Sequence, residues 1–310
     1  MTAIQITETY NLFRSFHGTT LPLEVCLKIV EEVVDIDPKN VRVLLCLSKG
    51  FQSLLKGYEH SITKKLAGDQ NLHYPIRPSL ASPEYVTFTP LSFPWLSESR
   101  LRIAITTFLA QHDISNLKRI GVADTTIQQS NNNLSETGQP TDRIKKDTLL
   151  IMFQLVDHAS GLKKMHSIRT RQIEFLEMLS ALELARLGYF VKTLGLGYAQ
   201  HMDLLPDRIP IRSIRERICV FENKVLQYGP YFAWAAIAGT ERARRWCRII
   251  MLEGLNDMKA FERGQCRAYA SLQSVVWKLF CKRADCDLAD SWAAMREAID
   301  RETSSEPKQA

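Results

Sequence analysis

The sequence has no apolar run long enough to cross a membrane as a helix, because a charged residue interrupts every hydrophobic stretch. No secretory leader is expected either, since residues 1–16 carry no basic segment followed by an apolar core. These features predict a cytoplasmic or nuclear protein that has no membrane partner.

Cysteine occurs without the spacing that metal sites require. The seven cysteines fall mostly among apolar residues of expected helices, which is typical of free, buried thiols. Cys281 and Cys286 are too far apart for a CxxC pair, and no histidine follows His201 to complete a zinc set. We expect no metal site in this chain.

Catalytic motifs are missing as well. No nucleophile elbow, glycine-rich phosphate loop or HExxH pattern accompanies His158 and His166, and a general base needs a positioned partner in a pocket. The glycines at 195 and 197 lack the third glycine of a dinucleotide site, so we expect a loop there. The sequence therefore predicts no catalytic residue, no cofactor and no enzymatic activity.

Charge of one sign is not concentrated. Lys and Arg number 40 against 34 Asp and Glu, and the two signs are mixed along the chain, so we expect no nucleic-acid partner. Two arginine clusters could bind phosphate or acidic peptides, although a solvated face balanced by nearby glutamates is the favoured interpretation. Their members are Arg212, Arg215 and Arg217, and Arg242, Arg244, Arg245 and Arg248.

Helical spacing of apolar residues is what the chain does have. With 310 residues, of which 45% are apolar and 24% charged, it can form one or two globular domains. No fixed repeat is found, so a solenoid or a propeller is not expected. We predict an all-α protein.

Three short helices are expected within residues 19–66, after a tail at 1–18. In the first, four apolar residues recur every four positions (Leu21, Val25, Ile29 and Val33), and Leu23, Cys26 and Val30 add apolar groups beside them. Asp37 and Pro38 should end this helix and open the second. Gly68 should end the third.

A connector rich in proline is expected at residues 67–97. Its five prolines, Pro94 included, oppose a regular helix, whereas its large apolar side chains predict that it packs. Residues 85–89 could form a short strand.

An irregular helical domain is expected at 98–302, with a disordered insertion near 124–144 and a polar tail at 303–310. We predict a long helix over 162–187 that Gly188 ends, and a capping box at Ser213 and Glu216. Gly229 and Pro230 should separate two helices, Thr240 should cap another, and a longer helix should begin near Asp257. Four tryptophans, at 234, 246, 277 and 292, are expected in the core, and two exposed in one groove would mark a substrate site.

Residues 21–55 resemble the F-box, whose pattern runs Leu-Pro-x-Glu-aliphatic, an Ile four residues on, a short turn, and an aliphatic-rich helix followed by an aromatic residue. The positions that fit are Leu21, Pro22, Glu24, Val25, Ile29, Leu44, Leu47, Ser48 and Phe51. The sequence departs from the pattern at Val41, at Phe51, where Trp is frequent, and in a longer turn at 35–39. Segments 225–234 and 271–280 are similar to stretches that recur in F-box proteins of filamentous fungi.

The resemblance implies a substrate-recruiting subunit of a Skp-cullin-F-box ubiquitin ligase. Its partners would be a Skp-type adaptor, a cullin held through that adaptor, and an unknown protein substrate. The residues implied to contact the adaptor are Leu21, Pro22, Val25, Ile29, Leu44, Leu47 and Phe51.

Two other functions remain open from the sequence. A helical scaffold or regulatory protein without a ubiquitin link would bury the face that contains Leu21 and Pro22. An enzyme would need a deep pocket with convergent polar groups in the C-terminal domain.

Overall fold

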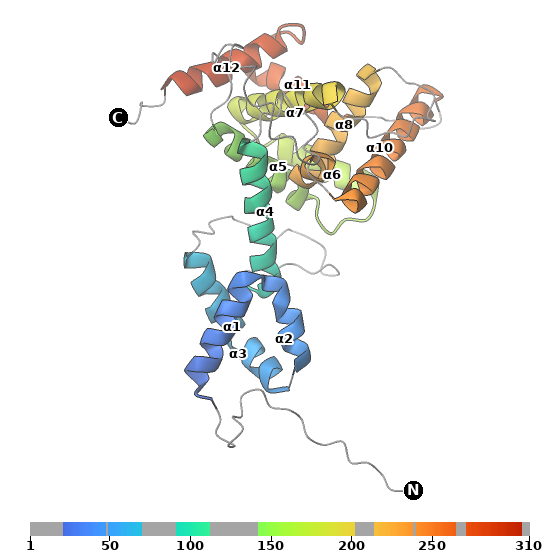
Figure 1. Ribbon diagram of the computed structural model, residues 1–310. Coiled ribbons are helices and arrows are strands. Elements are labelled where there is room, and N and C mark those ends of the chain that lie inside the picture. Colours follow the sequence, from blue (N-terminus) through green and yellow to red (C-terminus); the bar gives the residue numbers. More distant parts are fainter. Residues whose placement is uncertain are drawn as a thin grey trace, which may run out of the picture. The chain divides into compact units, whose positions relative to one another are not determined.

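The computed structural model describes residues 21–47, 49–69, 91–111, 142–201, 214–237, 240–264 and 271–305. These ranges hold twelve α-helices, one short 3₁₀ helix and no β-strand, which confirms the all-α prediction (Figure 1). The chain divides into an N-terminal unit, residues 1–78 and 86–103, and a C-terminal unit, residues 79–85 and 104–310. The predicted tail at 1–18, the insertion up to residue 141, Ser213 and most of the connector at 67–97 lie outside the described residues. A helix begins at Asp142, so the predicted disordered insertion does not extend to residue 144.

The N-terminal unit contains α1 (Leu23–Ile36), η1 (Pro38–Asn40), α2 (Val41–Leu47), α3 (Lys49–Asp69) and the first half of α4 (Phe93–Gln111). The junction between α1 and η1 follows the prediction: the Asp37 carboxylate accepts the backbone N–H of Lys39 at 2.9 Å, and Pro38 is the first residue of η1. The fixed φ of proline and its missing amide donor suit this position. Gly68 does not end α3, which continues to Asp69.

The start of α4 corrects the expectation of an extended connector up to residue 97. Pro94 is tolerated because it is the second residue of the helix, where a backbone N–H would have no acceptor within the helix. Phe93, Trp95 and Leu96 are buried in the core of the N-terminal unit, and the Glu59 carboxylate accepts the Phe93 N–H at 2.7 Å. This unit therefore includes a fourth helical segment beyond the three expected within 19–66.

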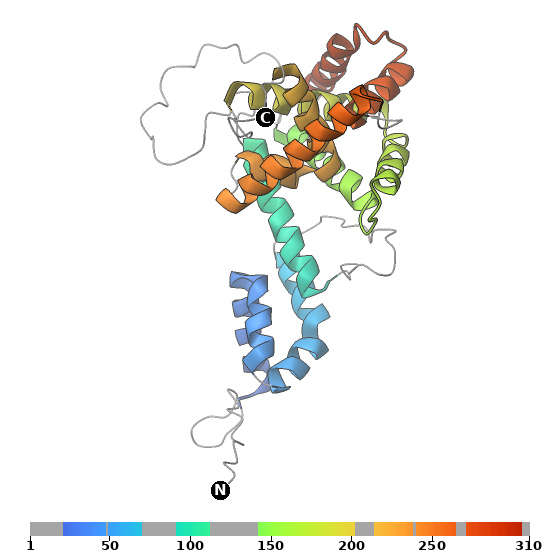
Figure 2. The ribbon, with the colours of Figure 1, turned by 90° about the vertical axis from the view of Figure 1, so that its right-hand side faces the viewer.

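The C-terminal unit contains the second half of α4 and eight further helices in the described residues: α5 (Asp142–His158), α6 (Met165–Leu176), α7 (Ala181–His201), α8 (Ile214–Tyr228), α9 (Pro230–Ile237), α10 (Glu241–Glu262), α11 (Leu272–Ala284) and α12 (Ser291–Ser305). At its centre, α7 packs against α5, α8, α11 and α12, while α8 also packs against α9 and α10 (Figures 1 and 2). Residues 220–227 of α8 are all buried.

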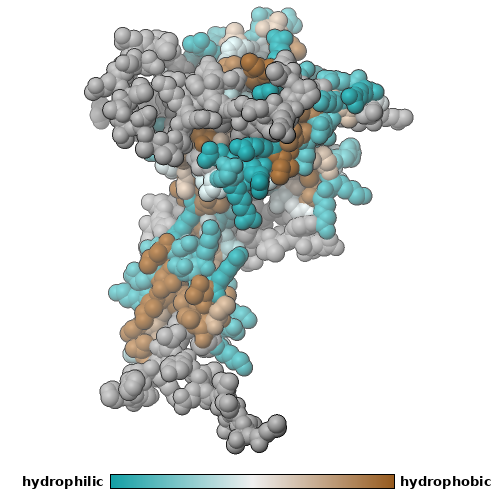
Figure 3. Space-filling model, turned by 45° about the vertical axis from the view of Figure 1, so that its right-hand side comes forward, coloured by the Kyte–Doolittle hydropathy of each residue, from teal (hydrophilic) through white to brown (hydrophobic). Residues whose placement is uncertain are grey.

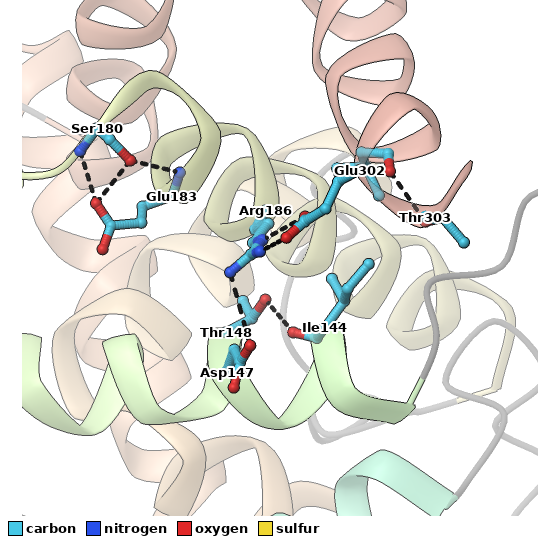
Figure 4. A network of polar contacts seen from close by, with 9 residues as sticks. Ile144, Asp147, Thr148, Ser180, Glu183, Arg186, Glu302 and Thr303 are labelled. Atoms are coloured by element: carbon cyan, nitrogen blue, oxygen red, sulfur yellow. Dashed lines mark hydrogen bonds and ion pairs between the residues drawn. The ribbon is translucent and has the colours of Figure 1, made fainter. Parts of the chain in front are cut away.

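The predicted long helix over 162–187 is two helices, and the prediction was wrong there. Ser180 and Glu183 form a capping box that starts α7: the Glu183 carboxylate accepts the Ser180 N–H at 2.7 Å, and the Ser180 hydroxyl accepts the Glu183 N–H at 3.2 Å (Figure 4). Gly188 does not end the helix. It lies inside α7, where a Cβ would come within 2.9 Å of the Met295 side chain. The glycines at 195 and 197 are also helical rather than in a loop.

Some of the other predicted helix boundaries are confirmed, and others are wrong. The Thr240 hydroxyl accepts the Ala243 N–H at 3.4 Å as the predicted cap of α10, and Gly229, at φ 72°, separates α8 from α9. No helix begins near Asp257, which is inside α10; the break comes after Glu262, and Gly264 has a φ of 69°. Helix α12 extends into the predicted tail, to Ser305.

An arginine on α7 holds this last helix. Arg186 Nε donates to Glu302 Oε2 of α12 at 2.9 Å, a second nitrogen of the guanidinium pairs with the same carboxylate, and Nη1 lies 3.8 Å from Asp147 Oδ2 of α5 (Figure 4). A guanidinium bonded twice to one carboxylate fixes orientation as well as distance. The contact explains why the polar end of the chain stays helical past residue 302.

The buried part of α8 carries polar side chains into the core. Asn223 Oδ1 accepts the first N–H of α11, from Leu272, at 3.0 Å and also accepts from Arg169 Nη1 of α6 at 3.2 Å. Glu222 is only 1% exposed and lies 3.3 Å from Lys192 Nζ of α7. The two helices come close at Gly195, where a Cβ would overlap the Glu222 carboxylate. Burial raises the pKa of Glu222 to about 7, although Lys192 and a hydrogen bond from Gln273 oppose the rise.

Replacing Glu222 by Gln should change how stability depends on pH. Between pH 4.5 and about 7 the folded protein keeps a proton on Glu222 that the unfolded chain has lost, so the wild type loses stability as pH rises through this window. Relative to the wild type, Glu222→Gln should gain roughly 2 kcal/mol of unfolding free energy between pH 5 and pH 8. Urea unfolding at both pH values measures this difference. Glu297→Gln, which alters an exposed ion pair with Arg301, serves as the control and should show almost no pH-dependent difference.

Candidate docking surface of the N-terminal unit

Helix α1 carries apolar side chains on two sides. Cys26, Val30 and Val34 are buried in the unit, whereas Val25 and Ile29 are 43% and 42% exposed. Ile36, 82% exposed, lies on the same side as these two, because positions i, i+4 and i+11 share one helix face. The residues that the sequence left beside the expected stripe, Cys26 and Val30, are thus the core-facing ones, and most of the stripe itself is exposed.

Five of the seven residues implied by the F-box resemblance are exposed: Leu21, Pro22, Val25, Ile29 and Leu47. Leu44 is not. It is 7% exposed and belongs to the core of the unit, where it packs α2 inward. Its contact with an adaptor stays a prediction. Phe51 lies in α3, but its side chain is outside the described residues.

Helix α2 adds two exposed apolar groups, the predicted Leu47 and also Val43, which was not predicted. Val43 and Leu47 are both exposed and four residues apart, so they share a face, while Val41 and Leu44 are buried. The sequence held a signal for this, because α2 is apolar at six of its seven positions and a short helix can bury only part of its circumference.

We call the exposed apolar side chains on this face of α1, together with those of α2, the apolar surface, and Figure 3 shows hydrophobic side chains exposed on the N-terminal unit. Its members are Leu21, Val25, Ile29, Ile36, Val43 and Leu47. Exposed charges on α1, among them Glu24, Lys28 and Glu32, lie between and beside them. An apolar patch with a polar border is the usual anatomy of a protein–protein interface.

The same unit holds α1 firmly in place. Arg100 of α4 donates from Nη1 to the carbonyl oxygens of Val34 and Asp35 at 3.2 and 2.6 Å, and from Nη2 to the Asp35 carboxylate at 2.6 Å. A cation at the carboxyl end of a helix also interacts favourably with the helix dipole. Glu31 of α1 pairs with Lys65 of α3. The apolar surface is therefore presented on a fixed helix.

A cavity of about 540 Å³ lies elsewhere in this unit, among η1, α2, α3 and the first turn of α4. Val41, Leu45, Leu55, Phe93 and Pro94 line its apolar part. Its two acidic residues are engaged inside the protein, Glu59 with the Phe93 N–H and Glu98 with Arg102 at 2.8 Å. Both carboxylates thus link elements of the N-terminal unit.

The two histidines considered for catalysis have separate surroundings. The ring of His158, at the end of α5, lies 5.6 Å from the ring of Phe175, and His166 is exposed in the first turn of α6. The two histidines therefore lie in different surroundings.

Comparison with known proteins gives no match to any family model, curated protein or solved structure. In the described part of the chain, no helix combines the length and apolar composition that a bilayer crossing requires. The F-box resemblance stays a prediction.

Arg100→Met should loosen the end of α1 without changing the apolar surface itself. Methionine keeps an unbranched stem like that of arginine but cannot donate the three hydrogen bonds. Together these hydrogen bonds from a cation should stabilise this turn by about 1–3 kcal/mol. Hydrogen exchange of the last α1 amides should accelerate accordingly. Lys64→Met, at an exposed site on α3, should leave these amides unchanged. Equal protection in Arg100→Met and wild type would contradict the role given to Arg100.

Proposed function

We propose that the N-terminal unit is an F-box-like module and that its apolar surface binds a Skp-type adaptor protein. Through the adaptor and a cullin, the chain would bring a protein substrate to a ubiquitin ligase. The chain itself would carry out no chemistry.

The observation that carries this proposal is the exposure of Leu21, Pro22 and Val25. A scaffold without an adaptor would be expected to bury this face, since exposed apolar groups gain from being removed from water. Instead, α1 turns one apolar side inward and leaves a second one open, and the open side contains most of the residues that the F-box resemblance implies.

The fixed position of α1 also supports docking. Because Arg100 and Lys65 hold the helix in place, the apolar groups do not have to be ordered when a partner binds, and the entropic cost of association is lower. A helix that presents apolar side chains at positions i and i+4 can fit a groove on a partner. Helix α1 does so with Val25 and Ile29, and α2 with Val43 and Leu47.

The C-terminal unit would then hold the substrate. Tethering raises the effective concentration of a substrate near the ubiquitin-charged enzyme, so no catalytic group is needed in this chain. The unit has its own continuous core, and it can therefore present a binding face that is independent of the apolar surface.

A direct test is binding of the full chain to a purified Skp-type adaptor, measured by calorimetry. Val25→Ser with Ile29→Ser should weaken binding at least about tenfold, because truncating two central apolar residues of an interface costs more than about 1 kcal/mol each. Both side chains are exposed in the free protein, so the double variant should fold normally by circular dichroism.

The matched control is Met178→Ser with Leu288→Ser, which also removes two exposed apolar side chains but lies in the C-terminal unit. It should bind the adaptor like the wild type. A well-folded wild type that fails to bind would overturn the adaptor function and favour the scaffold. Equal weakening by both double variants would show that the contact is non-specific.

A further inference from the structure

The first two turns of α10 carry several positive charges at the amino end of the helix, where positive charge is unfavourable. Four arginines, at 242, 244, 245 and 248, follow the Thr240 cap, and Glu241 is the one acidic residue among them. Glu241 pairs with Arg248 at 3.4 Å. The amino end of a helix already carries a partial positive charge, so each nearby cation costs stability, typically about 0.3–1 kcal/mol. The same arrangement attracts an anion.

Four exposed residues share one face in this half of α10. Arg242, Arg245, Trp246 and Ile249 occupy positions i, i+3, i+4 and i+7, and all four are exposed. We call them the Arg–Trp face. Figure 2 shows α10, in orange, in the foreground of the C-terminal unit, and no other described helix of that unit lies in front of it. The next residue on this face is Glu253, so the cationic part is limited to about two turns.

Trp246 is the one exposed member of the four tryptophans considered for the core, and it is rigidly placed. Its ring makes edge contacts with Tyr228 and Phe232, each with centroids 5.7 Å apart, while 37% of the residue remains exposed. Aromatic pairs in this geometry stabilise the ring position. A large apolar group that is already ordered loses little entropy on binding, which makes it suitable as an anchor.

The buried face of α10 determines the direction of the exposed Arg–Trp face. Cys247, Ile250, Met251 and Gly254 are buried, and a Cβ at Gly254 would lie 2.6 Å from Val220 Cγ1 and 2.8 Å from Lys224 Cε of α8. Since α10 packs against α8 without a side chain between them at this point, the contact sets which face of α10 is buried. The arginines and Trp246 are held facing outward.

We infer that the Arg–Trp face binds an acidic peptide segment that contains a large apolar side chain. Guanidinium groups form paired hydrogen bonds with carboxylates, and the exposed faces of Trp246 and Ile249 can receive the apolar residue. Arg and Trp are also the residue types most enriched at binding hot spots. This inference rests on the proposed function in one respect: the peptide would be part of the recruited substrate.

The probe is a fluorescein-labelled peptide of twelve residues, rich in Asp and Glu, with one Phe and one Leu at its centre, and binding to the full chain is followed by fluorescence anisotropy. Arg242→Gln with Arg245→Gln should weaken binding at least tenfold. A peptide with amides in place of its carboxylates, or with Ser in place of Phe and Leu, should also bind at least tenfold more weakly. Lys278→Gln with Lys282→Gln, which removes the same net charge from exposed positions on α11, should bind the peptide like the wild type.

Failure of the wild type to bind, equal binding of the amide peptide, or equal weakening by the two glutamine double variants would overturn the inference. Tighter binding of a single-stranded oligonucleotide, lost in the arginine variant, would assign the face to nucleic acid instead. The arginine variant should bind the adaptor normally, and Val25→Ser with Ile29→Ser should bind the peptide normally. The two assays therefore distinguish failure of the peptide-binding inference from failure of the proposed adaptor binding.

Discussion

The complete burial of residues 220–227 in α8 is the constraint on which the C-terminal unit depends. A helix that is covered on all sides must place its polar side chains inside the protein, and each must find a partner there. Asn223 meets this requirement by accepting the first N–H of α11. Glu222 meets it only in part: Lys192 Nζ of α7 lies 3.3 Å away, and burial raises the pKa of the carboxyl to about 7. Gly254 lets α10 lie directly on α8. The neighbours of α8 are positioned by these contacts, and the outward direction of the Arg–Trp face follows from them.

The N-terminal unit has the opposite difficulty, because it has more apolar surface than its interior can bury. A bundle of three short helices and part of α4 has one small core, and α1 supplies apolar residues for two faces. Burying Cys26, Val30 and Val34 leaves Val25 and Ile29 in solvent. An exposed apolar face on a helix held by Arg100 is a stable arrangement for binding a partner but an unfavourable one for a free monomer.

Local signals in the sequence predicted those elements whose boundaries are set by neighbouring residues. Asp37 with Pro38, Gly229 with Pro230, and the Thr240 cap act through backbone geometry within one turn, so no tertiary contact is needed to find them. One wrong boundary depended on a distant partner. Gly188 looked like a helix end, but its missing side chain makes room for Met295. The capping box at Ser180 and Glu183 was a local signal that the apolar periodicity on either side of it obscured.

The sequence by itself determined the all-helical class, several helix starts and the apolar excess of the first helix, because periodicity and capping are properties of nearby residues. Tertiary structure decided which side of α1 is exposed, since the Cys26 and Leu21 sides are both apolar and only packing against α3 and α4 chooses between them. It also placed Leu44 in the core of the N-terminal unit. The exposure of Trp246 beside two arginines was decided in the same way, by the close contact of α10 with α8 at Gly254.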